Sequence, residues 1–479
     1  MLRFFQVIFL FCVLLLISCE AESGHQKTKP DKSKPANSDI AINRILNRGV
    51  LRAATDYGSV SYLIYRGETI GYQYELLKEL TRYLGVKLEI RIEKNPEKSI
   101  QMLNKDKVDL IAMGLTVTNE RKKKVLFSDP IFTSEQVLIQ RLPDNFRELR
   151  TRDEIEAQLI RNQIELAGKT IYVQEGTVFP TRLKVLENEI GADINVIEDD
   201  KDVEDLIAAV SSGEIDYTIA DKYIALVIAR YYDNLDTQTP VSFPQQIAWA
   251  VKKGQTGLVD TINLWLEEFN NSLLSRILYK KYFENLRSGR IARSQYSSYS
   301  GGHLSPYDEE IREASEILGW DWRLLASLVY QESEFKPDVK SWVGAYGLMQ
   351  MMPATFEEYG LDTTANPKQQ LMAGARYLKK LNGQLPESID ERMERIKFTL
   401  AAYNCGLGHV LDARRLAKKY GMDPDKWDNN VDHFILGLSD SFYYHDTVVY
   451  YGYIRGEETY AFVNDILTRY ADYRNLISE

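Results

Sequence analysis

The pattern of apolar residues changes type within this chain, and that change constrains the fold more than any other feature. From Ile40 to about Leu286, short apolar runs typical of strands alternate with amphipathic helical stretches, and beyond Gly302 the pattern is almost wholly helical. Alternation of this kind predicts parallel sheets covered by helices, whereas the second pattern predicts a helical domain. At about 100–200 residues per folding unit, the 479 residues allow both.

The first region contains five runs that we expect to be strands: Val50 to Thr55, Leu88 to Ile92, Val108 to Met113, Thr170 to Val173 and Asp216 to Ala220. Between the first two runs, Tyr74 to Leu84 places its leucines on one helical face. Val203 to Val210 also has helical spacing. A segment rich in Ser, Gly and Arg, residues 287–302, then separates the two patterns and predicts a linker. We therefore expect domains at 39–286 and 303–479.

The amino terminus has the features of an export signal. In residues 1–19 one Arg precedes an apolar run, Phe4 to Ile17, which is too short to span a bilayer comfortably. It ends in LISC, which resembles the bacterial lipobox, and that resemblance implies that Cys19 becomes acylated. Residues 20–38 are polar and without periodicity, as in a flexible tether. We expect an exported lipoprotein on the periplasmic face of the envelope, at the outer membrane; an ordinary signal peptide is the alternative.

Composition excludes several classes of protein. The net charge of -10 argues against a nucleic-acid binder that neutralises phosphates. The five His are scattered without metal-binding spacing, so we expect no metal and no cofactor. Of the three cysteines, only Cys405 would remain as a free thiol after export, which excludes an intramolecular disulfide.

The second region carries an acidic residue where an apolar one is expected. In the helix that follows Asp321, residues Leu325, Leu328 and Val329 share one face, and Glu332 continues it. Desolvation on such a face raises the pKa of a carboxyl group, as a general acid requires. The plainer interpretation is a carboxylate at a helix end that turns into water or pairs with an Arg.

Four short motifs around this residue occur in a fixed order. They are ES at 332–333, SWVGAYGLMQMMP at 341–353, GARYL at 374–378 and AYNCG at 402–406. Together they resemble the soluble lytic transglycosylase domain, a relative of goose-type lysozyme, across about 305–475. The resemblance implies a mainly α-helical lysozyme-like domain that acts on peptidoglycan glycan strands. It implies cleavage of the β-1,4 bond between N-acetylmuramic acid and N-acetylglucosamine, with formation of a 1,6-anhydro ring.

The same resemblance assigns roles to residues. Glu332 matches the catalytic acid, which would protonate the leaving oxygen and then accept the proton of the muramyl C6 hydroxyl. Ser341 and Gln350 match residues that line the sugar groove, and Tyr403 and Asn404 belong to the AYN motif, with Tyr403 expected near Glu332. A loop hydroxyl, a helix cap and a buried structural tyrosine are the respective alternatives.

One part of the sequence departs from the family pattern. The family often ends with an ET..YV motif, and here Phe462 stands where the tyrosine is usual. Tyr460 is the candidate to replace it in the groove.

Ordinary glycosidases use two carboxylates. Glu334 points to a different helical face from Glu332, and spacing does not place Asp338. The lack of an obvious second acid fits transglycosylation. A hydrolytic muramidase remains the alternative enzyme.

The first region resembles family 3 periplasmic solute-binding proteins, which are two-lobed α/β receptors. The match is carried by GLTVTNER at 114–121 and VLFSDP at 125–130. It implies that Thr118 and Arg121 hold a ligand carboxylate, since an Arg fork bonds a carboxylate with two parallel donors.

Other positions of the receptor follow from the same resemblance. Thr177 marks the turn that offers backbone amides, Asp221 takes an amino group and Tyr57 supplies a ring. Ile131 stands where the family has a tyrosine. The implied ligand is an amino acid or a wall-derived muropeptide; a module that has kept its fold and lost its ligand is the alternative.

We therefore expect a lipid-anchored enzyme of cell-wall turnover whose activity responds to a ligand of its first domain. A competing hypothesis from another class is a non-catalytic lipoprotein that senses glycan or amino acids. The intact set of Glu332, Ser341, Gln350 and Tyr403 discriminates between them, because a pure binder has no need of the acid.

Overall fold

The computed structural model describes residues 40–284, 291, 294–298 and 302–477. The expected signal peptide, the tether and the acylation of Cys19 lie outside these residues. No helix in the described ranges is both long enough and apolar enough to cross a membrane.

The first lobe is built on a six-stranded mixed sheet. Its strand order is β4 (Lys87–Ile92), β1 (Val50–Thr55), β5 (Leu110–Thr116), β13 (Gln245–Lys252) and β6 (Val125–Phe127), and β7 (Phe132–Ser134) also pairs with β13. β1 runs parallel to β4 and β5, whereas β13 runs antiparallel to β5. Helices cover both faces: α2 (Ile40–Arg48), α3 (Tyr72–Leu84), α10 (Thr256–Asn270) and α11 (Leu273–Tyr279) contribute to one core cluster, and α4 (Pro96–Asn104) contributes to another. α5 (Asn119–Lys124) precedes β6.

The second lobe is built on a five-stranded sheet. Its strand order is β10 (Asn195–Asp199), β9 (Thr170–Gln174), β11 (Tyr217–Asp221), β8 (Gln136–Arg141) and β12 (Leu235–Pro240). Its helices are α6 (Arg152–Glu156), α7 (Phe179–Ile190), α8 (Val203–Ser212) and α9 (Lys222–Ile228). The strands and helices expected from periodicity are confirmed in both lobes, with ends that differ by at most three residues. The largest difference is at the run expected at Val108 to Met113, which is β5.

Two segments join the lobes, one between β7 and β8 and one between β12 and β13. They lie side by side, because the Val241 amide donates to the Gln136 carbonyl at 2.8 Å and the Gln136 amide donates to Ser242 Oγ at 2.9 Å. A paired connection of this kind can act as a hinge between two lobes.

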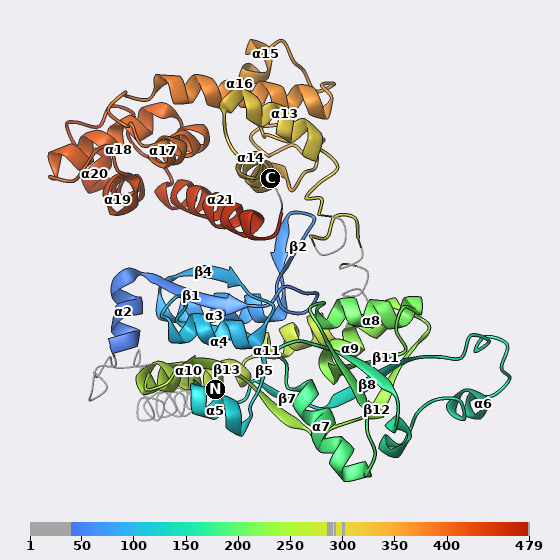
Figure 1. Cartoon of the computed structure of the whole chain (residues 1–479). Coiled ribbons are helices and arrows are strands. Elements are labelled where there is room, and N and C mark those ends of the chain that lie inside the picture. Colours follow the sequence, from blue (N-terminus) through green and yellow to red (C-terminus); the bar gives the residue numbers. More distant parts are fainter. Residues whose placement is uncertain (1–39, 285–290, 292–293, 299–301, 478–479) are drawn as a thin grey trace, which may run out of the picture.

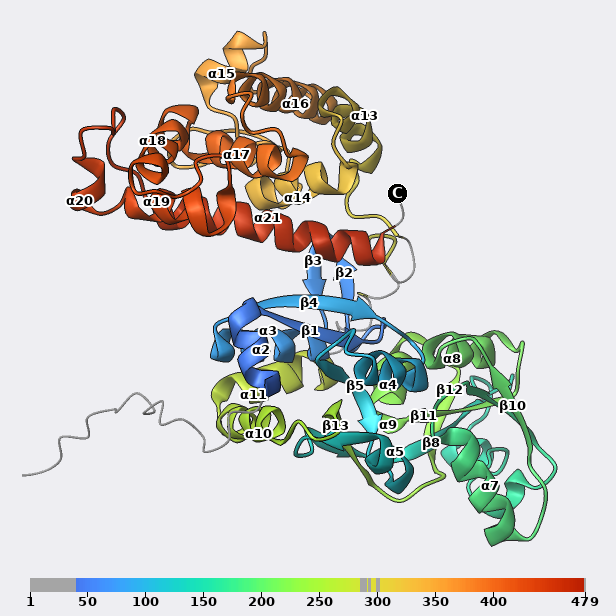
Figure 2. The same cartoon turned by 60° about the vertical axis from the view of Figure 1, so that its left-hand side comes forward.

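The second domain is helical, as the sequence predicts, and lies above the first in Figure 1. Its helices are α13 (Asp308–Leu318), α14 (Trp322–Ser333), α15 (Pro353–Glu358), α16 (Pro367–Gln384), α17 (Arg392–Cys405), α18 (Leu407–Lys419), η4 (Trp427–Val431), α19 (Asp432–Gly437), α20 (Ser441–Tyr444) and α21 (Gly456–Leu476). Figure 2 shows α21 along the side that faces the first domain. α14 begins at the side-chain cap of Asp321 and is buried over most of its length.

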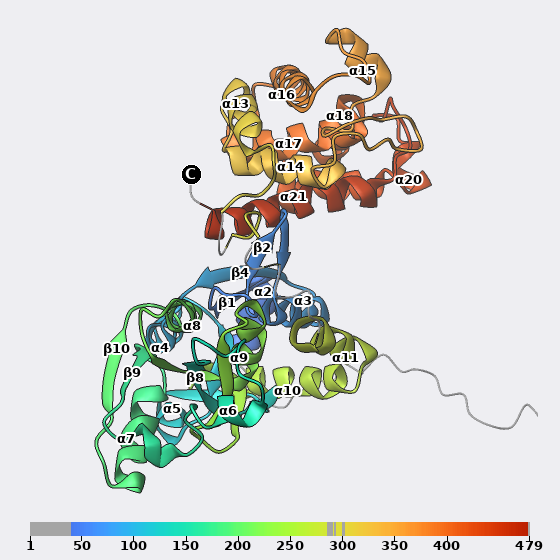
Figure 3. The same ribbon diagram turned by 90° about the vertical axis from the view of Figure 1, so that its right-hand side faces the viewer.

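A small hairpin connects the two domains. β2 (Leu63–Tyr65) and β3 (Glu68–Ile70) leave the first lobe and reach the helical domain (Figures 1 and 3). Ile64 is fully buried in the core of the helical domain, and the Tyr473 hydroxyl of α21 donates to the Gly67 carbonyl at 2.6 Å. The expected architecture is therefore confirmed, with the hairpin as a feature that periodicity did not predict.

Candidate functional site

Glu332 lies in the last turn of α14, at a point where the backbone changes direction sharply. The next residues after Ser333, Glu334 and Phe335, have φ of 51° and 60°, values that side-chain-bearing residues rarely adopt. Ser333 fixes this end of the helix, because its hydroxyl bonds to the carbonyls of Val329 at 3.1 Å and Leu348 at 3.0 Å. The buried body of α14 and this anchor hold the Glu332 backbone in place.

The electrostatic environment of Glu332 is simple. Its side chain is partly buried, and burial raises the pKa of its carboxyl group to about 8, with no charged neighbour contributing. In the described part of the chain no hydrogen bond reaches the Glu332 carboxyl group. Glu334 pairs with Lys336, and Asp338 accepts a hydrogen bond from the Tyr346 hydroxyl at 3.3 Å. The arrangement offers one acid that is protonated at neutral pH.

The loop after α14 is held by its own polar side chains. Ser341 Oγ accepts the Ala345 amide at 3.0 Å, and Gln350 Nε2 donates to the carbonyls of Val339 at 3.0 Å and Gly347 at 2.9 Å. These contacts give Ser341 and Gln350 a role in shaping the loop.

Tyr403 lies near Glu332, as expected. Burial and then the nearby Glu332 raise the pKa of Tyr403, while its hydroxyl donates to the Met349 carbonyl and not to the acid. Asn404 Oδ1 accepts the Thr459 hydroxyl at 2.7 Å, which joins α17 to α21. Tyr460, also on α21, has its pKa raised by burial and then by Asp432, so it lies toward α19.

The receptor cleft lies between the two lobes of the first domain. It contains a cavity of about 70 Å³ lined by Arg121, Thr177 and Asp221, among others. Arg121 is 4% exposed and donates to the carbonyls of Thr116 at 3.2 Å and Gly176 at 3.4 Å. Asp221 is 7% exposed, and burial raises its pKa to about 7 against the opposing effect of Arg121. The structure thus brings the expected carboxylate-binding and amine-binding residues to one cavity.

The other two expected ligand residues do not line this cavity. Thr118 caps α5, with its Oγ1 accepting the Arg121 amide at 3.2 Å. The Tyr57 ring lies beneath the Lys94 ammonium, 5.3 Å from its centroid, and burial raises the Tyr57 pKa to about 12. Thr118 therefore contacts Arg121 and Tyr57 contacts Lys94, and Arg121 and Lys94 both line the cavity.

Comparison with known proteins agrees with this geometry. Residues 309–425 match the model of the Transglycosylase SLT domain, and residues 51–285 match that of Bacterial extracellular solute-binding proteins, family 3. A protein of Desulfosudis oleivorans named "Membrane-bound lytic murein transglycosylase F" is 33% identical over 89% of this chain and 90% of its own. This chain belongs to the membrane-bound lytic murein transglycosylase F family. A Pseudomonas fluorescens protein of the same name is 32% identical over 90% of this chain and 86% of its own length.

Among solved structures, an ancestral amino acid-binding protein, a precursor of cyclohexadienyl dehydratase, is similar to the receptor part. It is 28% identical with a TM-score of 0.42, and the match covers 50% of this chain and 98% of that one.

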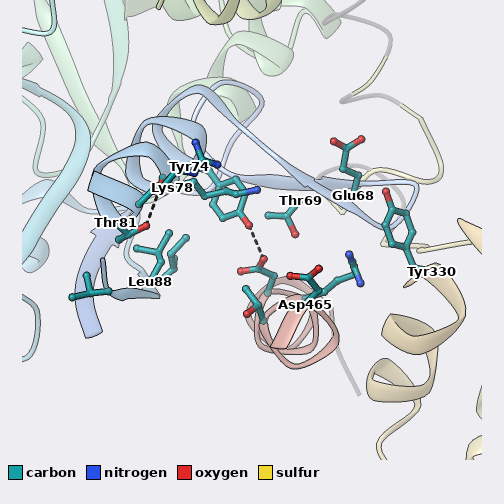
Figure 4. A pocket seen from close by; sticks show the side chains of 14 residues that line it. Glu68, Thr69, Tyr74, Lys78, Thr81, Leu88, Tyr330 and Asp465 are labelled. Atoms are coloured by element: carbon teal, nitrogen blue, oxygen red, sulfur yellow. Dashed lines mark hydrogen bonds between the residues drawn. The ribbon is translucent and has the colours of Figure 1, made fainter. Parts of the chain in front are cut away.

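In this transglycosylase F family member a second, larger cavity lies between the two domains. It measures about 480 Å³, and its lining includes Glu68 and Tyr74 from the first domain and Tyr330, Asp465 and Asp472 from the second. Figure 4 shows the side chains of Glu68, Tyr74, Tyr330 and Asp465 at this cavity, and the dashed line from the Tyr74 hydroxyl marks its hydrogen bond to Asp472. Their hydrogen bond is 3.2 Å long, and the Tyr62 hydroxyl donates to the other carboxyl oxygen at 2.7 Å. Asp472 is therefore a point where both domains meet.

Gln370 of α16 was not predicted from the sequence. Its side chain holds the loop that follows α14 by hydrogen bonds. Its Oε1 accepts the Leu348 amide at 2.8 Å, and its Nε2 donates to the Ala365 carbonyl at 2.9 Å. Gly347 has φ of 80°, and a Cβ there would lie 2.3 Å from Gln370 Oε1, so this contact requires glycine. The available signal was a glutamine beside Leu371 on the buried face of an amphipathic helix.

Proposed function

We propose that this protein is a lytic murein transglycosylase that cleaves the β-1,4 bond between N-acetylmuramic acid and N-acetylglucosamine without water. The observation that carries the proposal is the isolated Glu332, whose pKa burial alone raises to about 8. A carboxyl group in that state can give a proton at neutral pH. The family named above supports the same reaction class.

The proposed reaction needs only this acid. Glu332 donates its proton to the glycosidic oxygen as the bond from C1 of the muramyl unit breaks, and N-acetylglucosamine leaves with that proton. The acetamido group of the same muramyl unit stabilises the positive charge at C1. The C6 hydroxyl then attacks C1 and returns its proton to the Glu332 carboxylate, which closes the 1,6-anhydro ring. Atoms and protons balance without a second carboxylate.

Identification of the products tests this reaction. Residues 20–479 are incubated with purified peptidoglycan, and the released muropeptides are weighed by mass spectrometry. Muramyl ends lighter by one water than hydrolytic ends are expected. Reducing muramyl ends would instead identify a hydrolytic muramidase, and bound glycan without products would identify a sensory lipoprotein.

We propose further that the first domain binds an amino acid or muropeptide and modulates cleavage in cell-wall turnover. The geometry that supports this is a connection from the cleft between the lobes, through the β2–β3 hairpin, to the residues around Glu332. Ser59 of the first lobe donates from its amide at 2.8 Å to Glu204 of the second lobe, and four residues later the β2–β3 hairpin begins. The tip of that hairpin packs against Tyr330 and Phe335, which flank Glu332 in sequence. Activity that stays constant across a titration of muropeptides would exclude modulation.

We also propose that Cys19 is acylated and anchors the chain at the periplasmic face of the outer membrane. Incorporation of labelled fatty acid into the wild-type chain, and its loss in Cys19→Ser, is the test. Separation of inner and outer membranes then locates the anchored protein.

A further inference from the structure

Carboxylates outnumber cations where the two lobes of the receptor domain meet. Burial and then the charges of Asp221, Asp56 and Glu204 raise the pKa of Tyr223, which places all three acids around one buried hydroxyl on the cavity. The cavity also contains Lys94 and Arg121. The charge that the three acids present to a ligand therefore depends on which groups Lys94 and Arg121 pair with.

Both cations form their closest contacts with groups other than the three acids. Lys94 forms its ion pair with Asp202. Arg121 donates to two backbone carbonyls, and the carboxylate it approaches is Glu97, at 3.9 Å. Within the described ranges, Asp56, Glu204 and Asp221 have no cation at salt-bridge distance.

Among the described residues, two of the three acids also have one carboxyl oxygen without a hydrogen-bond donor, although Ser59 donates to the other oxygen of Glu204. Asp56 Oδ1 and Glu204 Oε2 are both buried and have no hydrogen-bond partner in the part of the chain that the structure describes. Asp221 is 7% exposed and lines the cavity. Burial raises the pKa of Glu204 to about 8 and that of Asp221 to about 7. A buried carboxyl oxygen without a hydrogen-bond partner destabilises a fold unless a bound group compensates it.

The charges of a matching ligand follow from this arrangement. An amino acid places its carboxylate on Arg121 and its ammonium on Asp221, as the proposed receptor role requires. Asp56 and Glu204 then still lack a cation. We propose that the cleft binds a ligand with one carboxylate and two cationic groups, that is, a dibasic amino acid, either free or within a peptide. This inference rests on the proposed ligand-binding role of the first domain.

Ligand entry requires the lobes to separate. A cavity of about 70 Å³ holds a few water molecules but not a dibasic amino acid. Opening at the paired connection between the lobes breaks the contacts of Ser59 with Glu204, whose Oε1 accepts both the amide at 2.8 Å and the hydroxyl at 2.9 Å. The opened cleft then presents the whole Glu204 carboxyl group to the ligand.

Isothermal titration of the chain from Glu20 to Glu479 tests the charge requirement. The probes are lysine and arginine, and norleucine and citrulline as analogues that lack the side-chain charge. We expect the charged member of each pair to bind roughly 10- to 100-fold more tightly, since hydrogen bonds to charged groups contribute about 1.5–3 kcal/mol. Glycyl-lysine carries the same three charges in a peptide, so its affinity relative to lysine distinguishes the two sources.

Two variants locate the second cation site. Asp56→Asn and Glu204→Gln are each expected to remove most of the preference for lysine over norleucine. Glu120→Gln is the matched control, because Glu120 is an exposed carboxylate beside Arg121. The ligand series on the wild-type chain decides the question even where a variant fails to fold.

Three results would overturn the inference: norleucine and citrulline binding as tightly as lysine and arginine, no binding of any probe, or an unchanged preference in both variants. Tight binding of the neutral analogues would leave the receptor role intact and exclude the charge requirement. The same preparation is also assayed for peptidoglycan cleavage. Cleavage at the expected rate would show that the catalytic function stands even where the ligand-binding inference fails.

Discussion

At the scale of single residues, the environment of Glu332 decides what its carboxyl group can do. The residue is two positions from Glu334 and six from Asp338, yet each of those acids has its own partner and does not contribute to the Glu332 pKa. Because burial alone acts on Glu332, its neutral form is favoured at pH 7. This is the protonation state that a general acid needs before the bond breaks.

Replacement of the acid gives the first prediction. Glu332→Gln keeps the size of the side chain and removes the transferable proton, so peptidoglycan turnover should fall by at least about 10²- to 10⁴-fold. Glycan binding should remain near that of the wild type in a co-sedimentation assay. Glu334→Gln, two residues away and exposed, is the control and should retain activity. Release of muropeptides by Glu332→Gln at the wild-type rate would refute the mechanism.

The raised pKa gives a second prediction, about pH. Activity should decline as pH rises through about 8, because Glu332 loses the proton it must donate. Between the ordinary glutamate pKa and about 8, the folded state holds a proton that the unfolded state has lost. The free energy of unfolding contributed by this residue therefore decreases as pH rises across that window.

The side chain introduced by Glu332→Gln does not ionise. The variant should therefore lack the pH dependence of the free energy of unfolding that Glu332 contributes. Urea denaturation of both chains at pH 5 and pH 8 measures it: the variant should gain stability relative to the wild type at the higher pH. A difference in the free energy of unfolding between the two chains that is the same at pH 5 and pH 8 would contradict the raised pKa of Glu332.

At the scale of elements, the β2–β3 hairpin brings the first domain into contact with the end of α14, the helix that carries Glu332. Its turn at Arg66 and Gly67 has φ of 50° and 81°, the pattern of a tight two-residue turn that suits twisted strands. A Cβ at Gly67 would lie 2.5 Å from Phe335 and 2.6 Å from Tyr330. The turn is therefore fitted to the residues around Glu332.

Gly67→Ala tests the fit between the hairpin and α14. Gly85→Ala is the matched control, since Gly85 also has positive φ (69°) but a Cβ there meets nothing within 4 Å. Both substitutions carry the backbone cost of alanine in that conformation, about 1 kcal/mol. Gly67→Ala should lose a further ~1–3 kcal/mol from the clash and should also lower the rate of glycan cleavage. Equal stability and equal activity of the two variants would show that the hairpin does not affect the site.

At the scale of the whole molecule, a buried carboxyl group joins the two domains. Asp472 of α21 accepts hydrogen bonds from Tyr62 and Tyr74, and burial raises its pKa although the tyrosine donors oppose that shift. The cavity of Figure 4 adjoins this contact, so the interface is incompletely packed beside its main polar link. Such an interface can hold one relative orientation of the domains and still allow another.

Removal of the two donors should loosen the domains. Tyr62→Phe with Tyr74→Phe leaves the Asp472 carboxyl group buried without its two tyrosine hydrogen bonds, at about 1–3 kcal/mol for an unsatisfied group. Small-angle X-ray scattering should report a larger radius of gyration for the double variant. Tyr470→Phe is the control, because the Tyr470 hydroxyl bonds to Asp321 within the helical domain at 3.1 Å. An unchanged scattering curve for the double variant would show that this contact does not hold the domains together.

The amino-acid sequence by itself determined the kinds of element and their order. Strand runs such as Val50–Thr55, the helix expected from Tyr74 to Leu84 and the change to a helical pattern beyond Gly302 all follow from local spacing of apolar residues. Local spacing also placed Glu332 on the apolar face of α14. These features depend on neighbours a few positions apart, which is why periodicity reveals them.

Only the tertiary structure decided how the parts meet. Tyr62 and Asp472 are 410 residues apart, and the Ser59 contact with Glu204 spans 145. No local pattern marks either pair. The same holds for Gln370, and for Thr118 and Tyr57, which lie beside the receptor cavity. Long-range packing also leaves the acids of the cleft without cations and isolates Glu332, because burial and charge at a site are set by whichever distant segments cover it.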